Sequence, residues 1–160
     1  MTPKFTLTSG GSIRVREKTT SDGPALGQML ESCSEQTYHF FHPYELTLES
    51  GEKVAANEEI LCHVAFYQVD RAVGYVWLQG LDSDFPTLGI CVVDGWQDQG
   101  IGHLLMNTAI EEGRSLSKDG IKLTVNQDNP RARSLYEKVG FKLEREVEGR
   151  FSSYSMILKF

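Results

Sequence analysis

The chain has 160 residues, of which 16 are Lys or Arg and 22 are Asp or Glu, so that its formal net charge is −6. This length suits one domain with a sizeable core, and the acidic balance without a basic block excludes the electrostatic footprint of a nucleic-acid binder. The sequence has no apolar run of the roughly 18 residues that a membrane span needs, and its N-terminus lacks the organisation of a signal peptide. We therefore expect a cytoplasmic protein, with residues 1–160 forming one domain and residues 1–11 frayed, that binds neither nucleic acid nor a membrane.

The Cys and His residues do not form a ligand pattern. Cys33, Cys62 and Cys91 are odd in number and lack a CxxC pair, which indicates reduced, buried thiols. The four histidines show neither HxxxH nor HxH spacing with acids or cysteines. The sequence therefore predicts no metal site.

Hydrophobic periodicity predicts the elements of the first half of the chain. Residues 13–18 alternate as a half-buried strand, and a helix follows from Asp22, with Pro24 in its first turn. The aromatic-rich stretch 37–50 is broken at Pro43, which predicts two helical pieces of the kind that often covers a binding cleft. Residues 60–66 and 72–80 are apolar on both faces and predict a buried hairpin.

The second half of the chain alternates strands and helices. Residues 88–93 predict another buried strand, and a glycine-rich loop leads from it into a helix over 101–116, for which Gly120 is the expected C-terminal glycine. Residues 121–126 then predict a strand and residues 130–141 a helix. The stretches 141–149 and 152–160 predict two closing strands.

The glycine-rich loop is the first feature that points to a ligand. The first N–H groups of a helix have no partner inside it and lie at the positive end of its dipole. Gly95, Gly100 and Gly102 leave few side chains to block the approach of an anion such as a diphosphate. Such a loop can equally be a simple helix cap, and its late position, after an antiparallel hairpin, argues against a dinucleotide-binding fold.

Two segments together carry a family resemblance. The loop Gln97-Asp98-Gln99-Gly100-Ile101-Gly102 and the downstream stretch VNQDNPRARSLYEKVGF, residues 125–141, strongly resemble the motifs of the GNAT superfamily of acetyl-CoA-dependent N-acyltransferases. The resemblance is close over residues 60–160, and the predicted elements from Ile13 onward fit it. It implies an α+β GNAT fold, with a mixed, mostly antiparallel sheet of six to seven strands, splayed between residues 88–93 and 121–126, and about four helices.

The resemblance also implies acetyl-CoA as co-substrate, with no metal. Residues 97–102 would form the pyrophosphate loop, residues 92 and 93 would pair with the pantetheine arm, and Tyr136 would lie near the thioester sulfur. The cofactor-binding residues that it implies are Val92, Val93, Gln97, Asp98, Gln99, Gly100, Ile101, Gly102, His103, Asn129 and Tyr136.

One position departs from the family pattern. Many relatives carry Arg or Lys inside the loop, whereas this chain has Asp98, an acid where a base would help to bind an anion. Affinity should then depend more on backbone dipoles and on a nearby cation. Arg131, Arg133 and Lys138 are the alternatives for that cation.

The implied reaction is the transfer of acetyl to a primary amine by direct attack on the thioester. The acceptor is a small-molecule amine, or the N-terminus or a lysine of a protein. Tyr136 is the predicted catalytic residue, because a phenol stays protonated near neutral pH and can hydrogen-bond to or protonate a departing thiolate. Its helical spacing with Leu135 and Val139 would equally suit a core aromatic.

Several alternatives stay open at this point. A non-catalytic coenzyme A-binding or sensor module on the same fold is the rival function, and a homodimer is a possible assembly. A general base would help, since a lysine-like amine with a pKa near 10.4 is neutral in only about one molecule in 2,500 at pH 7. The candidates for the base are Asp82, Asp84, Glu45, His42 and His63, and those for the acceptor pocket are Phe40, Phe41, Tyr44 and Trp77.

Overall fold

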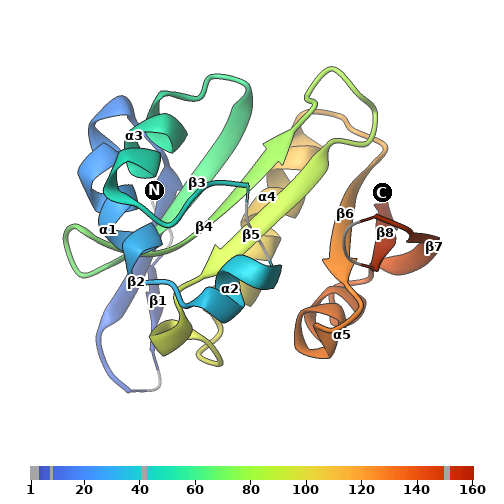
Figure 1. Ribbon diagram of the computed structural model, residues 1–160. Coiled ribbons are helices and arrows are strands. Elements are labelled where there is room, and N and C mark those ends of the chain that lie inside the picture. Colours follow the sequence, from blue (N-terminus) through green and yellow to red (C-terminus); the bar gives the residue numbers. More distant parts are fainter. Residues whose placement is uncertain (1–3, 8, 41–42, 150–151) are drawn as a thin grey trace.

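The structure is a computed structural model that describes residues 4–7, 9–40, 43–149 and 152–160. Within these residues, eight strands form one sheet in the order β1-β2-β3-β4-β5-β6-β8-β7 (Figure 1). All neighbouring strands are antiparallel except β5 and β6. The strands are β1 (Lys4–Thr6), β2 (Ser12–Glu17), β3 (Ile60–Tyr67), β4 (Arg71–Gln79), β5 (Thr87–Val92), β6 (Gly120–Asn126), β7 (Lys142–Val147) and β8 (Ser153–Lys159).

Helices cover both faces of the sheet. Helices α1 and α3 lie on one face and α4 on the opposite face (Figure 1). One apolar cluster therefore fills the space under α1 and α3, and a second packs α4 and α5 against the sheet. This two-sided cover explains why β3 and β4 are apolar on both faces. The helices are α1 (Gly23–Glu31), α2 (Glu35–Phe40), α3 (Leu48–Ala56), α4 (Ile101–Ser115) and α5 (Pro130–Lys138), with short 3₁₀ turns at Thr20–Asp22 and Asp94–Trp96.

The α+β class and the mixed, mostly antiparallel sheet are confirmed, although the described strands number eight and the α-helices five. Residues 1–11 were expected to be frayed, but β1 lies among them. It pairs with β2, with Phe5 opposite Ile13, and Leu7 just after it is buried. A three-residue strand is too short to show a period of two in the sequence.

Helix α4 covers nearly the predicted range, but Gly120 is not its C-terminal glycine. It ends at Ser115, and Ser117 adopts the left-handed conformation, with φ 58°. Gly120 instead begins β6, where an added Cβ would collide with the carbonyl oxygen of Leu158. The glycine is needed there for a close approach of two strands rather than for a helix cap.

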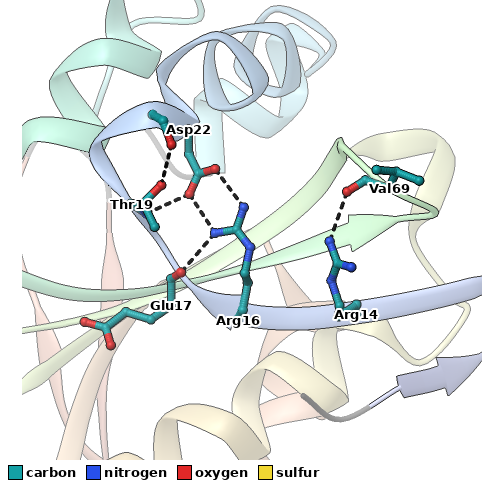
Figure 2. Close-up of polar contacts among 7 residues, drawn as sticks. Arg14, Arg16, Glu17, Thr19, Asp22 and Val69 are labelled. Carbon is teal, nitrogen blue, oxygen red and sulfur yellow. Dashed lines mark hydrogen bonds and ion pairs between the residues drawn. The ribbon is translucent and has the colours of Figure 1, made fainter. Parts of the chain in front are cut away.

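An ion pair holds the start of α1 against the sheet (Figure 2). The Arg16 guanidinium donates to both carboxylate oxygens of Asp22, at 2.8 and 2.9 Å, and the Thr19 N–H donates to the same carboxylate at 2.7 Å. The Arg16 hydrogen bond is the largest influence on Asp22, and together with the Thr19 contact it lowers the pKa of this carboxyl despite its burial.

Strands β5 and β6 pair only where they begin. Thr87 lies opposite Lys122, and the Lys122 N–H donates to the carbonyl of Pro86 at 3.0 Å. The Val93 N–H donates to Val73 on the β4 side, so the alternation of a strand points the backbone groups of Ile90 and Val92 toward β6. The predicted splay is therefore present, and it exposes backbone groups along one edge of β5.

Candidate functional site

A cavity of about 620 Å³ lies where β5 and β6 diverge. Its walls come from these two strands, from α2, from the loop before α4 and from α5. Eight of the eleven predicted cofactor-binding residues line it. They are Val92, Gln97, Asp98, Gly100, Gly102, His103, Asn129 and Tyr136.

The other three predicted residues direct their side chains elsewhere. Val93 is buried in the cluster under α1 and α3, and Ile101 is buried in the cluster under α4. The Gln99 side chain accepts a hydrogen bond from the hydroxyl of Ser9 at 3.4 Å. A ligand in the cavity would therefore have to meet Gln99 and Ile101 through their backbone. Val93 is not available in this way, because its N–H donates to the Val73 carbonyl at 2.9 Å and its carbonyl accepts from the Trp96 N–H at 2.8 Å.

The first turn of α4 opens into the cavity. Gly100 is the N-cap residue, with φ 90°, and the N–H of Leu104 donates to its carbonyl at 3.1 Å. By helix geometry the amides that precede Leu104 in this turn lack carbonyl partners within the helix. An added Cβ at Gly102 would lie 3.4 Å from the Leu135 side chain and 3.9 Å from that of Val92, so the missing side chain keeps this wall of the cavity open. The turn thus fits an anion such as a diphosphate.

The three candidate cations have different surroundings. The Arg131 guanidinium binds the Asp98 carboxylate at 2.7 Å and the side-chain oxygen of Gln97 at 2.6 Å, and it lines the cavity. Lys138 also lines it. Arg133 does not, because it binds Glu137 at 2.7 Å and lies over the Tyr154 ring. Asp98, the acid in a loop that is expected to bind an anion, is thus paired with a cation.

Tyr136 lies on α5 and is only 8% exposed, yet it lines the cavity. Its ring meets Phe141 edge-on, with the two centroids 6.2 Å apart. Burial, and to a smaller extent the neighbouring Cys91, raise the pKa of the Tyr136 phenol. The hydroxyl therefore stays protonated across the physiological pH range. The start of α5 is capped by Asn129, whose side-chain oxygen accepts from the N–H of Ala132 at 3.2 Å.

Helix α2 forms the wall opposite α5, and Asp94 fixes its start. The Asp94 carboxylate accepts from the Ser34 N–H at 2.9 Å, from the Ser34 hydroxyl at 2.7 Å and from the Thr37 hydroxyl at 2.9 Å. These bonds outweigh partial burial and lower the pKa of Asp94. Sequence reasoning missed Asp94, because its partner Ser34 lies 60 positions away and no local pattern connects them.

Among the predicted acceptor-pocket residues, Phe40 lines the cavity. Trp77 packs against Gly89, where an added Cβ would collide with its ring. The Tyr44 hydroxyl accepts from the Asn57 side chain at 3.0 Å. Phe41 lies outside the described residues.

The described candidates for the general base, Asp82, Asp84, Glu45 and His63, are absent from the cavity lining. Glu45 accepts from the Tyr38 hydroxyl at 3.0 Å, and His63 contacts Glu112 of α4 at 3.5 Å. Burial is the main cause that lowers the pKa of His63. His42 lies outside the described residues. The titratable side chains that do line the cavity include His103 and Asp128.

The three cysteines are free thiols, with Cys62 and Cys91 buried and Cys33 half-buried. Burial raises the pKa of Cys62 to about 12, which keeps it protonated. The part of the chain that the structure describes holds no group of three or more His, Cys, Asp or Glu residues arranged for a metal ion. Nor does any helix in those residues have both the length and the apolar character for crossing a bilayer.

Comparison with known proteins fits this geometry. The family model "Acetyltransferase (GNAT) family" matches residues 26–141. The chain belongs to the GNAT acetyltransferase family. Among curated proteins, this GNAT chain is 29% identical over 83 residues to the uncharacterized N-acetyltransferase YvbK of Bacillus subtilis. That match covers 52% of this chain and 54% of YvbK, so the chain spans about half the length of that relative.

Solved structures show the same GNAT fold. The GNAT domain of S. lividans PAT matches with a TM-score of 0.83 and 18% identity, over 98% of this chain and 97% of that one. A spermidine N-acetyltransferase from Vibrio cholerae, in complex with CoA and spermine, matches with a TM-score of 0.73 and 21% identity, over 92% and 95%. At these identities the similarity establishes the fold.

Proposed function

We propose that this GNAT protein is an N-acetyltransferase that moves an acetyl group from acetyl-CoA to a primary amine by direct attack on the thioester. The observation that carries the proposal is the single cavity in which a glycine-lined helix N-terminus, the open edge of β5 and the Tyr136 phenol meet. CoA is bound in the similar Vibrio cholerae enzyme, which supports the same ligand here.

The residues present fit acetyl-CoA in three regions of the cavity. The first turn of α4, kept open at Gly102, would hold the diphosphate. The backbone groups of Ile90 and the N–H of Val92, which face the opening, would pair with the pantetheine amides, while the Val92 carbonyl accepts from the Gln97 side chain at 3.0 Å. Tyr136 and the α2 residues Thr37 and Phe40 line the remaining walls, where the thioester and the acceptor amine would meet.

Tyr136 would act on the leaving group. Acetyl-CoA would supply a thioester whose carbonyl carbon forms a bond to the nitrogen of a neutral amine and whose carbon–sulfur bond breaks. The nitrogen loses one proton and the sulfur gains one, so that the products are the amide and the free thiol of coenzyme A. The Tyr136 phenol keeps its proton because its pKa is raised, so it can donate a hydrogen bond to the negative charge that develops on sulfur. A neutral donor in a largely buried position stabilises this charge more than it stabilises the uncharged thioester.

The test is an assay of free-thiol release with acetyl-CoA and a panel of amines that includes polyamines, free amino acids and peptides with a free N-terminus or a lysine. In Tyr136→Phe, the ring that packs on Phe141 is kept and only the hydroxyl is lost. We expect kcat to fall by about 10²- to 10⁴-fold, with little change in acetyl-CoA affinity or in stability. A Tyr136→Phe variant that keeps more than about half of the wild-type rate would reduce Tyr136 to a packing residue.

One observation favours the rival function, a coenzyme A-binding module without catalysis. The four described base candidates from the sequence lie outside the cavity lining, so a base for the amine would have to be another residue, such as His103 or Asp128, which do line it. The same panel distinguishes the two functions. A wild-type protein that binds coenzyme A in calorimetry and releases no thiol with any amine would support the binding module.

A further inference from the structure

Arg131, Asp98 and Gln97 form a chain of polar contacts along the cavity wall. The Arg131 guanidinium binds Asp98 at 2.7 Å and Gln97 at 2.6 Å, and the Gln97 amide nitrogen donates to the carbonyl of Val92 at 3.0 Å. All four residues line the cavity. The contacts therefore join the start of α5 to the loop before α4 and to the open edge of β5.

The position of Asp98 makes this arrangement unfavourable for an anion. The residue lies in the loop, two positions before the N-cap Gly100, and its side chain is 80% exposed. Its charge has the same sign as a diphosphate at the first turn of α4. The cation best placed to compensate, Arg131, already has its guanidinium bound to Asp98.

We propose that the Asp98–Arg131 pair is a latch: Asp98 holds the guanidinium that binds the coenzyme A diphosphate, and coenzyme A binds by taking Arg131 from Asp98. The inference rests on the proposed function and identifies Arg131 as the diphosphate-binding cation. Phosphate and carboxylate oxygens both accept the paired N–H groups of arginine, so the exchange replaces one charge-assisted pair by another. Asp98 thereby sets the affinity below the value that the site would otherwise reach.

Calorimetric titration of coenzyme A tests the latch in wild type, Asp98→Asn, Arg131→Gln and the double variant. Asp98 has a φ of 63°, which asparagine adopts readily, so Asp98→Asn leaves the loop backbone unstrained. We expect Asp98→Asn to tighten binding by about two- to five-fold and Arg131→Gln to weaken it by about ten-fold. Weaker binding by Asp98→Asn would overturn the latch, since Asp98 would then be orienting Arg131 for the ligand.

The double variant separates the latch from simple repulsion. Once Arg131 is gone, Asp98→Asn can relieve only the repulsion between the carboxylate and the diphosphate, so its gain in affinity should be clearly smaller than with Arg131 present. Equal gains in the two backgrounds would overturn the latch. The gain should also shrink between about 20 and 300 mM salt, because exposed charges are screened. A gain that does not respond to salt would contradict the electrostatic cause.

Arg133→Gln is the matched control, because Arg133 lies on the same helix but is held by Glu137 away from the cavity. It should leave coenzyme A affinity unchanged, and a loss equal to that of Arg131→Gln would overturn the assignment of the cation. Dephospho-coenzyme A keeps the diphosphate but lacks the ribose 3′-phosphate. The Arg131→Gln loss should persist with it, and disappearance of the loss would overturn the diphosphate contact. If wild type binds no coenzyme A at all, the proposed function itself fails.

Discussion

At the residue scale, Asp22 couples the stability of the fold to pH. Its folded-state pKa is lowered, chiefly by Arg16, so the stabilisation is present above the unfolded value of about 3.9 and is lost as pH falls through the folded value. We expect Asp22→Asn to reduce the free energy of unfolding at pH 7 by about 2 kcal/mol. In urea denaturation, the difference between wild type and variant should shrink as pH falls below about 4.

Asp82→Asn is the control for this prediction, because it makes the same chemical change at an exposed carboxyl. It should alter the free energy of unfolding by less than about 0.5 kcal/mol. If Asp22→Asn unfolds with the same energy difference at pH 7 and pH 3, the Arg16–Asp22 pair is not the source of the acid sensitivity.

At the element scale, a substitution in the first turn of α4 can test ligand binding without unfolding the protein. Gly100 is poorly suited to a test, because its φ of 90° would strain any side chain and the Phe5 ring lies 3.0 Å from an added Cβ. Gly102 has neither problem, and a valine there would extend its methyl groups between Leu135 and Val92. We expect Gly102→Val to fold with a free energy of unfolding within about 1 kcal/mol of wild type, since the higher helix propensity of valine offsets the crowding of its methyl groups against Leu135.

Coenzyme A should then distinguish wild type from Gly102→Val. At a ligand concentration near 100 times Kd, binding contributes about 2.7 kcal/mol and should raise the Tm of wild type by about 5–10 °C. The valine should abolish this shift. Gly95→Val, in the same loop and with no atom within 4 Å of its added Cβ, should keep it. An unchanged shift in Gly102→Val would remove the helix N-terminus from the site.

At the scale of the whole molecule, the sheet consists of a body of β1–β5 and an arm of β6–β8, and among the described residues the strands of these two parts pair only near Thr87. Figure 1 shows the two parts separating below this point, with α2 and α5 on either side. A ligand between them would supply partners for the backbone groups of Ile90 and for the N–H of Val92, whose carbonyl already accepts from the Gln97 side chain. We expect coenzyme A to slow hydrogen exchange in peptides covering residues 88–93 and 121–126 by about ten-fold or more.

The outer strand β7 serves as the internal control for the exchange experiment. It pairs with β8 and forms the far edge of the sheet, so its protection should not change when coenzyme A binds. Protection confined to the first turn of α4, with none along residues 88–93, would contradict the placement of a ligand between the two parts.

The sequence by itself determined the order of nearly all elements and two motifs, one in the loop before α4 and one in α5, and the family resemblance of these motifs implied the class of the fold. These features are local: apolar period, glycine position and helix caps are readable within a window of about twenty residues. The strand β1 was missed because three residues show no period. The end of α4 was predicted to within one residue, but its C-terminal glycine was wrongly assigned to Gly120, because Ser117 adopts the left-handed conformation.

Only the tertiary structure decided which side chains share the cavity. Arg131 meets Gln97 across 34 positions and Asp94 meets Ser34 across 60, while Asp82, Asp84, Glu45 and His63 are placed outside the lining. Such pairings depend on the order and register of strands, above all on where β5 and β6 stop pairing. No local pattern encodes that point, because it depends on how α4 packs across β4 and β5 of one part and β6 of the other.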